Sequence, residues 1–244
     1  MSYLVPSEFV TKMVDAGESK IYMATRDALI RAYMAGAILA IAAVFAVTVN
    51  VQTGLPILGA ALFPVGFCIL YLMGFDLLTG VFMLTPLAWM ERRPGVTWRA
   101  ILKHWGIVFV GNFLGALTVA LLMAIVFTYG FSIPPGKVGE VISHIGEDRT
   151  LGVVGAMIST TVSGKVIAMW MPIMLFFFMG FEHSVVNMFL FPSALIMGGN
   201  FSIMDYLVWN EIPVVLGNLV GGISLTGLTL YTTHMKTAPR RRFN

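Results

Sequence analysis

The stretch GFEHSVVNMFLFP at positions 180–192 repeats the pattern of GFDLLTGVFMLTP at positions 74–86. The two stretches share Gly, Phe, an acid, a later Leu and the final Pro, with an offset of 106 residues. The same offset carries GNFLGA (111–116) onto GNLVGG (217–222). Two matching blocks at one offset indicate an internal duplication, and each copy places a glycine and an acid inside an apolar run.

Composition sets the class of protein. The chain has 244 residues, of which 58% are hydrophobic and 11% are charged, whereas a soluble domain is about 25% charged. The apolar runs are long and do not alternate, which favours an all-α membrane protein over a transmembrane barrel. The single Cys68 excludes an internal disulfide.

The apolar runs predict a single transmembrane domain over 1–244 with about six transmembrane helices, of which the second and fifth are interrupted at the duplicated stretches and the fourth is truncated. A crossing needs about 20 apolar residues, so the short run Leu151–Val162 is not a full span by itself. The expected parts are an N-terminal amphipathic cytoplasmic segment (1–27), a first repeat (28–131), a second repeat (151–235) and a basic cytoplasmic tail (236–244).

Lysine and arginine positions predict the orientation. They gather in segment 1–27, in the loop after the second span and in the tail 236–244. Because these residues collect on the cytoplasmic side, both termini should be cytoplasmic and the number of crossings even. The region between Gly130 and Lys165 then has to supply a crossing. Three crossings in each half would make an inverted repeat, which is typical of transporters and channels whose pathway runs between the repeats.

The duplicated breaks differ at one position. Asp76 and Glu182 are equivalent, so a shared structural role is favoured, in which each acid accepts backbone N–H groups at the start of the second half-helix. His183 has Leu77 as its counterpart, so the symmetry is lost there. Intramembrane ionisable residues are usually functional. A bare anion is disfavoured in a low-dielectric pore, and a histidine that attracts or protonates it predicts a small monovalent anion of a weak acid as substrate.

The blocks GKVIAMWMPI and GFEHSVVNMF, together with GFDLLTG, GNFLGA and NEIPVVLGNLVGG, resemble the formate/nitrite transporter family. The resemblance implies an aquaporin-like bundle, a homopentamer with a pore in each protomer, and a bacterial or archaeal cytoplasmic (inner) membrane. It favours formate, moved with or without a coupled proton. The chain departs from the family pattern after Arg149, where about a helix's worth of residues is absent.

The same resemblance assigns site residues. His183 matches the central pore histidine, and Thr79 matches the loop threonine that faces it. The other residues that it places along the pore are Leu77, Leu78, Phe63, Phe67, Phe176, Asn187 and Asn218. For the phenylalanines and Asn218, packing within the membrane is the competing interpretation.

Other functions stay open to different degrees. Nitrite, hydrosulfide, acetate and lactate suit the same scaffold, and a water or glycerol channel would be favoured by twin NPA motifs, which the sequence lacks. An enzyme is not expected, because there is no GxSxG motif and Ser184 diverges from its neighbour His183. No cofactor or metal is expected, since the four histidines are far apart in sequence. The basic clusters are short and fit membrane lipid, not nucleic acid.

Overall fold

The computed structural model describes residues 6–145 and 162–236, and this part of the chain is helical without strands. The protein is therefore an all-α membrane protein, as its composition predicts. The elements are α1 (Pro6–Tyr22), α2 (Thr25–Thr53), α3 (Pro56–Leu62), α4 (Pro64–Leu72), α5 (Leu78–Met90), α6 (Trp98–Phe127), α7 (Lys137–Ile145), α8 (Val162–Phe178), α9 (Ser184–Ile196), α10 (Ile203–Asp205), the π-helix η2 (Tyr206–Glu211), α11 (Ile212–Val220), the π-helix η3 (Gly221–Leu228), α12 (Thr229–Tyr231) and the π-helix η4 (Thr232–Lys236).

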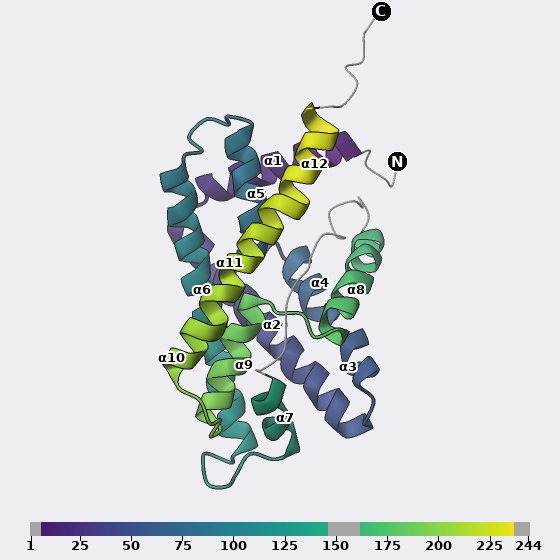
Figure 1. Ribbon diagram of the computed structural model, residues 1–244, viewed down its shortest axis with the longest axis vertical. Helices are drawn as coiled ribbons and strands as arrows, with labels where there is room; N and C mark the ends of the chain where they lie inside the picture. The colour runs from purple at the N-terminus through teal and green to yellow at the C-terminus, as the bar shows by residue number, and fades with distance from the viewer. Residues whose placement is uncertain (1–5, 146–161, 237–244) are drawn as a thin grey trace, which may run out of the picture.

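Three continuous helical segments are long and apolar enough to cross a membrane. They are α2, α6 and the run Ile203–Met235, which joins α10 to η4. Two further segments are each built from shorter helices. The first consists of α3, α4 and α5, and the second consists of α8 and α9. Figure 1 shows α6 and the run Ile203–Met235, which contains α11, extending along the long axis of the molecule. The second and fifth predicted spans are thus interrupted, as expected.

The two interruptions have the same local geometry. Gly74 and Gly180 both have positive φ, 71° and 75°, a conformation that glycine adopts without the steric penalty of a side chain. The half-helices that follow, α5 and α9, are each 13 residues long and begin 106 residues apart, and each contains one proline, Pro86 or Pro192. The duplication therefore extends from sequence to backbone. That the two halves are inverted relative to each other stays a prediction.

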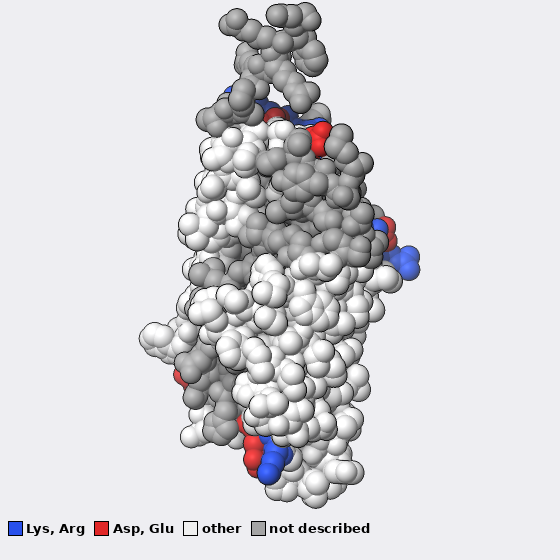
Figure 2. Space-filling model, turned by 90° about the vertical axis from the view of Figure 1, so that its right-hand side faces the viewer, with Lys and Arg blue, Asp and Glu red and all other residues white. Residues whose placement is uncertain are grey.

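The arrangement of the ends agrees with the grouping of basic segments. Figure 1 places α1, the turn between α5 and α6, and α12 at one end of the molecule, with the turns after α6 and α9 at the other. Where Figure 2 draws described residues, most of the face carries no charged side chain. Such an uncharged surface between two polar ends fits a lipid bilayer.

The fourth span, which the sequence predicts to be truncated, is described only at its edges. α7 has nine residues, too few to cross a bilayer, and it lies at the end opposite the termini (Figure 1). The crossing expected between Gly130 and Lys165, and the short run that begins at Leu151, fall mostly on residues 146–161, which lie outside the described residues.

The N-terminal amphipathic segment forms α1, which packs on the bundle. Its apolar face, which includes Phe9, Val10 and Met13, is buried together with Leu87 of α5 and Tyr231 of α12. The contact is close, because a Cβ at Gly17 would overlap the carbonyl oxygen of Leu84. α1 is thereby held across the end of α5, beside the first break.

Candidate functional site

A cavity of about 450 Å³ reaches from α1 to the middle of the bundle. Lys20 and Ala16 of α1 line one part of it, and His183 lines another. The cavity gathers several of the residues that sequence comparison suggested. Those that line it are His183, Thr79, Leu77, Phe67 and Asn218, together with Asp76, whereas Leu78, Phe63, Phe176, Asn187 and Glu182 do not.

His183 is held by residues from three other elements. It precedes α9 in an extended conformation (φ −131°, ψ 116°) and is only 3% exposed. Its Nε2 lies 3.1 Å from the hydroxyl oxygen of Thr79. The rings of Phe67 and Phe176 meet the imidazole edge-on, with centroid distances of 5.6 and 5.9 Å. The Nδ1 atom is buried and has no hydrogen-bond partner among the described residues.

A packed aromatic layer lies behind Phe67. Phe63 stacks on Phe177 with a centroid distance of 4.0 Å, and meets Phe67 edge-on at 5.7 Å. Phe63, Phe176 and Phe177 are all buried and do not line the cavity. The rings therefore fill the space next to Phe67, as expected for a constriction of the pore. Phe177 was not predicted, because the sequence does not show which of the three consecutive phenylalanines at 176–178 face the neighbouring helices.

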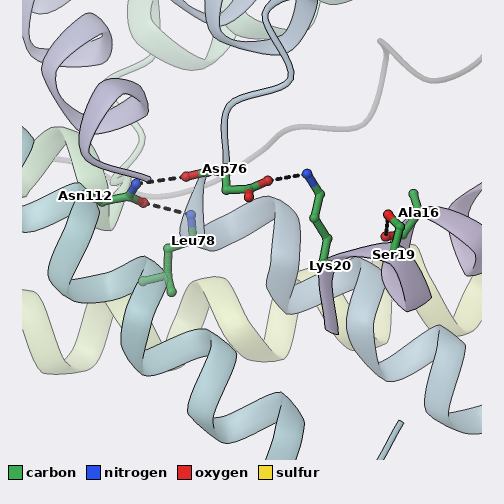
Figure 3. Close-up of polar contacts among 6 residues, drawn as sticks. All are labelled: Ala16, Ser19, Lys20, Asp76, Leu78 and Asn112. Carbon is green, nitrogen blue, oxygen red and sulfur yellow. Dashed lines mark hydrogen bonds and ion pairs between the residues drawn. The ribbon is translucent and has the colours of Figure 1, made fainter. Parts of the chain in front are cut away.

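The half-helix that follows the first break, α5, is capped by an asparagine from α6. Asn112 Oδ1 accepts a hydrogen bond from the Leu78 N–H (2.9 Å), and Asn112 Nδ2 donates to the carbonyl oxygen of Asp76 (2.9 Å), as Figure 3 shows. The same Nδ2 also donates to the carbonyl oxygen of Ala32 (2.7 Å). One fully buried amide therefore ties the first break to both α2 and α6.

The half-helix that follows the second break, α9, shows the same arrangement 106 residues later. Asn218 Oδ1 accepts from the Ser184 N–H (3.1 Å), and Asn218 Nδ2 donates to the carbonyl oxygen of Glu182 (3.4 Å). The prediction that Asp76 and Glu182 accept the backbone N–H groups is therefore wrong for the first N–H of each half-helix. An amide performs this role because it both donates and accepts, and each break presents one N–H and one carbonyl oxygen.

The two acids instead hold other partners. The carboxylate of Asp76 forms an ion pair with Lys20 of α1 (Figure 3). The Asp76 side chain is almost fully buried, whereas the Lys20 side chain keeps 17% of its surface exposed. The pair joins α1 to the first break and leaves the ammonium group on the cavity wall.

The carboxylate of Glu182 binds amide groups. It accepts hydrogen bonds from Asn187 and from Asn210 (3.0 Å), and Asn187 Nδ2 also donates to Asn210 Oδ1 (2.7 Å). Asn187, expected along the pore, is thus committed to this cluster and does not reach the cavity. The described residues contain no group of three or more His, Cys, Asp or Glu that could hold a metal ion.

Comparison with known proteins places the chain among membrane transporters. The family model described as formate/nitrite transporter matches residues 7–232. An uncharacterized transporter, YrhG, of Bacillus subtilis is 32% identical over 266 residues, covering 99% of this chain and 98% of that protein. The formate channel BtFdhC of Bacillus thuringiensis is 30% identical, covering 97% and 98%. The alignment with YrhG is longer than the 244 residues of this chain, so at least 22 of its positions face a gap here, which agrees with a shortened chain.

Solved structures show the same fold. A pentameric formate channel with formate bound superposes with a TM-score of 0.68 at 22% identity, covering 86% of this chain and 97% of that one. An ion channel of the FNT family gives a TM-score of 0.76 at 18% identity, covering 93% and 98%. Sequence identities this low support the likeness of fold and do not by themselves transfer a substrate.

Proposed function

Because the chain belongs to the formate/nitrite transporter family, we propose that it moves small monovalent anions of weak acids across a membrane, with formate preferred. The observation that carries the proposal is the buried imidazole of His183 on the wall of a cavity, with Nδ1 unpartnered among the described residues. The preference for formate rests on relatives named as formate channels.

The proposed path begins in the part of the cavity lined by Lys20, whose charge is balanced by the carboxylate of Asp76. Beyond it the walls become apolar, and an anion there loses its hydration at a high cost in free energy. His183 offsets this cost by donating a hydrogen bond or by transferring a proton, so that the substrate passes the aromatic layer as the neutral acid. Thr79, in contact with Nε2, orients the ring.

The proposed assembly is a homopentamer in a bacterial or archaeal cytoplasmic membrane, with a pore in each protomer and both termini cytoplasmic. The structural relative described as a pentameric formate channel supports the assembly. The orientation is supported by α1, the turn after α5 and α12, which lie at one end of the molecule (Figure 1) and carry or adjoin the basic clusters.

The test of this function is transport in proteoliposomes. Vesicles that contain the protein should take up labelled formate faster than empty vesicles, and unlabelled formate should compete better than nitrite, acetate or lactate. Osmotic shrinkage in glycerol should not be accelerated. Faster shrinkage in glycerol without formate uptake would instead indicate a neutral-solute channel and would overturn the proposal.

The Lys20–Asp76 pair gives a prediction on stability. Lys20→Met leaves the buried carboxylate of Asp76 without its cation, and breaking a buried ion pair in this way costs on the order of 3 kcal/mol. We expect a lower midpoint of thermal unfolding in detergent, followed by tryptophan fluorescence. The double variant Lys20→Met, Asp76→Asn should recover most of the loss, because the remaining side chain is neutral.

The matched control for this prediction is Lys12→Met, since Lys12 is an exposed lysine of the same helix. Its unfolding midpoint should stay at the wild-type value. If Lys20→Met and Lys12→Met unfold alike, the ion pair does not hold α1 in place.

A further inference from the structure

A third buried acid, after Asp76 and Glu182, lies in the last apolar helix. Glu211 ends the π-helix η2, and its residue is only 3% exposed. Its Oε2 accepts a hydrogen bond of 2.7 Å from the hydroxyl of Tyr206, five residues earlier. Its Oε1 is buried and has no hydrogen-bond partner among the described residues. The carboxyl group thus has one hydrogen bond where an ionised group could accept about four.

The described residues place no paired cation beside Glu211, and none of the ion pairs that they form includes it. Of the elements that pack against η2, α9 and α11 carry no ionisable side chain, and α10 carries the exposed Asp205. Asn210, the residue before Glu211, donates a hydrogen bond to the carboxylate of Glu182.

A negative charge on both Glu211 and Glu182 is strongly disfavoured in a membrane interior. An unpaired buried carboxylate costs several kcal/mol, and a like charge nearby adds to this. A proton on one carboxyl group removes both costs. Glu182 is the better carboxylate of the two, because two asparagine amides donate hydrogen bonds to it, whereas Glu211 has only the Tyr206 hydroxyl.

We propose that Glu211 is a proton-binding site, neutral at physiological pH and paired with Tyr206, in the part of the bundle that supports the second break. The π-helical turn contributes directly, because its spacing of five residues places the Tyr206 hydroxyl next to the Glu211 carboxyl group. Such turns are frequent at functional sites. Loss of the proton adds a second negative charge beside Glu182. Because Glu182 immediately precedes His183, this charge opposes the entry of an anion to the central histidine.

Infrared spectroscopy tests the protonation state in the full-length protein without substrate. At neutral pH the wild type should show a carboxylic-acid C=O band at a higher frequency than the amide I band, and the band should disappear at alkaline pH. Glu211→Gln should abolish the band. Tyr206→Phe should keep it and raise its frequency, because the hydrogen bond from the tyrosine is lost.

The matched control is Glu91→Gln. Glu91 also accepts a hydrogen bond from a tyrosine, Tyr231 (2.5 Å), but it is only partly buried, at the end of α5. This variant should leave the band unchanged. A wild-type spectrum without a carboxylic-acid band, or a band that persists in Glu211→Gln, would overturn the proposal. Because the measurement needs no transport, its failure is separate from failure of the formate channel function.

Transport gives the second readout. Formate flux through Glu211→Gln and the wild type should be similar at acidic pH, and the variant should retain several-fold more flux at alkaline pH, where only the wild type gains the extra negative charge. A constant ratio between the two proteins at every pH would contradict the link between Glu211 and the central histidine.

Discussion

Replacing His183 by alanine is expected to lower formate flux about 10- to 100-fold. A hydrogen bond to a charged group contributes about 1.5–3 kcal/mol, and each 1.4 kcal/mol corresponds to a tenfold change in rate. Without the imidazole, an anion in the cavity meets the ring of Phe67 in place of a group that can donate a proton. The measurement is the initial rate of labelled formate uptake into proteoliposomes, normalised to the amount of inserted protein.

The control for this variant is His234→Ala. His234 lies in η4 near the C-terminal end of the bundle and does not line the cavity, so its replacement should leave formate flux unchanged. Glycerol-driven shrinkage of the His183→Ala vesicles checks that the smaller side chain has not opened a non-selective path. Equal formate flux in His183→Ala and the wild type would remove the role proposed for the histidine.

Replacing Asn112 by alanine is expected to destabilise the protein by about 3 kcal/mol or more. The substitution leaves the Leu78 N–H and the Asp76 carbonyl oxygen without the buried amide that now binds both. Each unsatisfied buried polar group costs about 1–3 kcal/mol. The measurement is the thermal unfolding midpoint in detergent, followed by the fluorescence of Trp105, which is buried in the same helix.

Asn218→Ala is the matched variant in the second repeat. Its two hydrogen bonds are longer, 3.1 and 3.4 Å, so a smaller decrease in the unfolding midpoint is expected. Asn112→Asp loses the donor and places an unpaired buried carboxylate beside the Asp76 carbonyl oxygen, so its unfolding midpoint should be no higher than that of Asn112→Ala. If both alanine variants unfold like the wild type, the asparagines do not hold the two breaks together.

The positions of the breaks could be predicted from the sequence, because the signals are local. A glycine followed by an acid inside an apolar run occurs twice at one offset, and Gly74 and Gly180 supply the positive φ that ends each first half-helix. The functional role expected for His183 followed from comparing the two copies of the repeat, because Leu77 occupies the equivalent position in the first copy. Its contact with Thr79 followed from the family resemblance, and the side chains do meet.

The partners of the acids could not be predicted, because they are tertiary contacts. Lys20 precedes Asp76 by 56 residues, and no local spacing connects them. Asn218 was predicted to lie along the pore, with packing as the competing interpretation, and the capping role of Asn112 and Asn218 was missed, although the need of each break for both a donor and an acceptor pointed to an amide. Glu211 lies in the last apolar run, which also contains Asp205, and its hydrogen bond with Tyr206 depends on the π-helical spacing of five residues.

The most direct test of the central claim is a cryo-electron microscopy map of the assembled protein in lipid with formate present. The account predicts density for the anion inside the cavity of each protomer, within hydrogen-bonding distance of His183 and near Thr79. A map in which the imidazole faces lipid or a neighbouring subunit, with no passage beside it, would contradict the account.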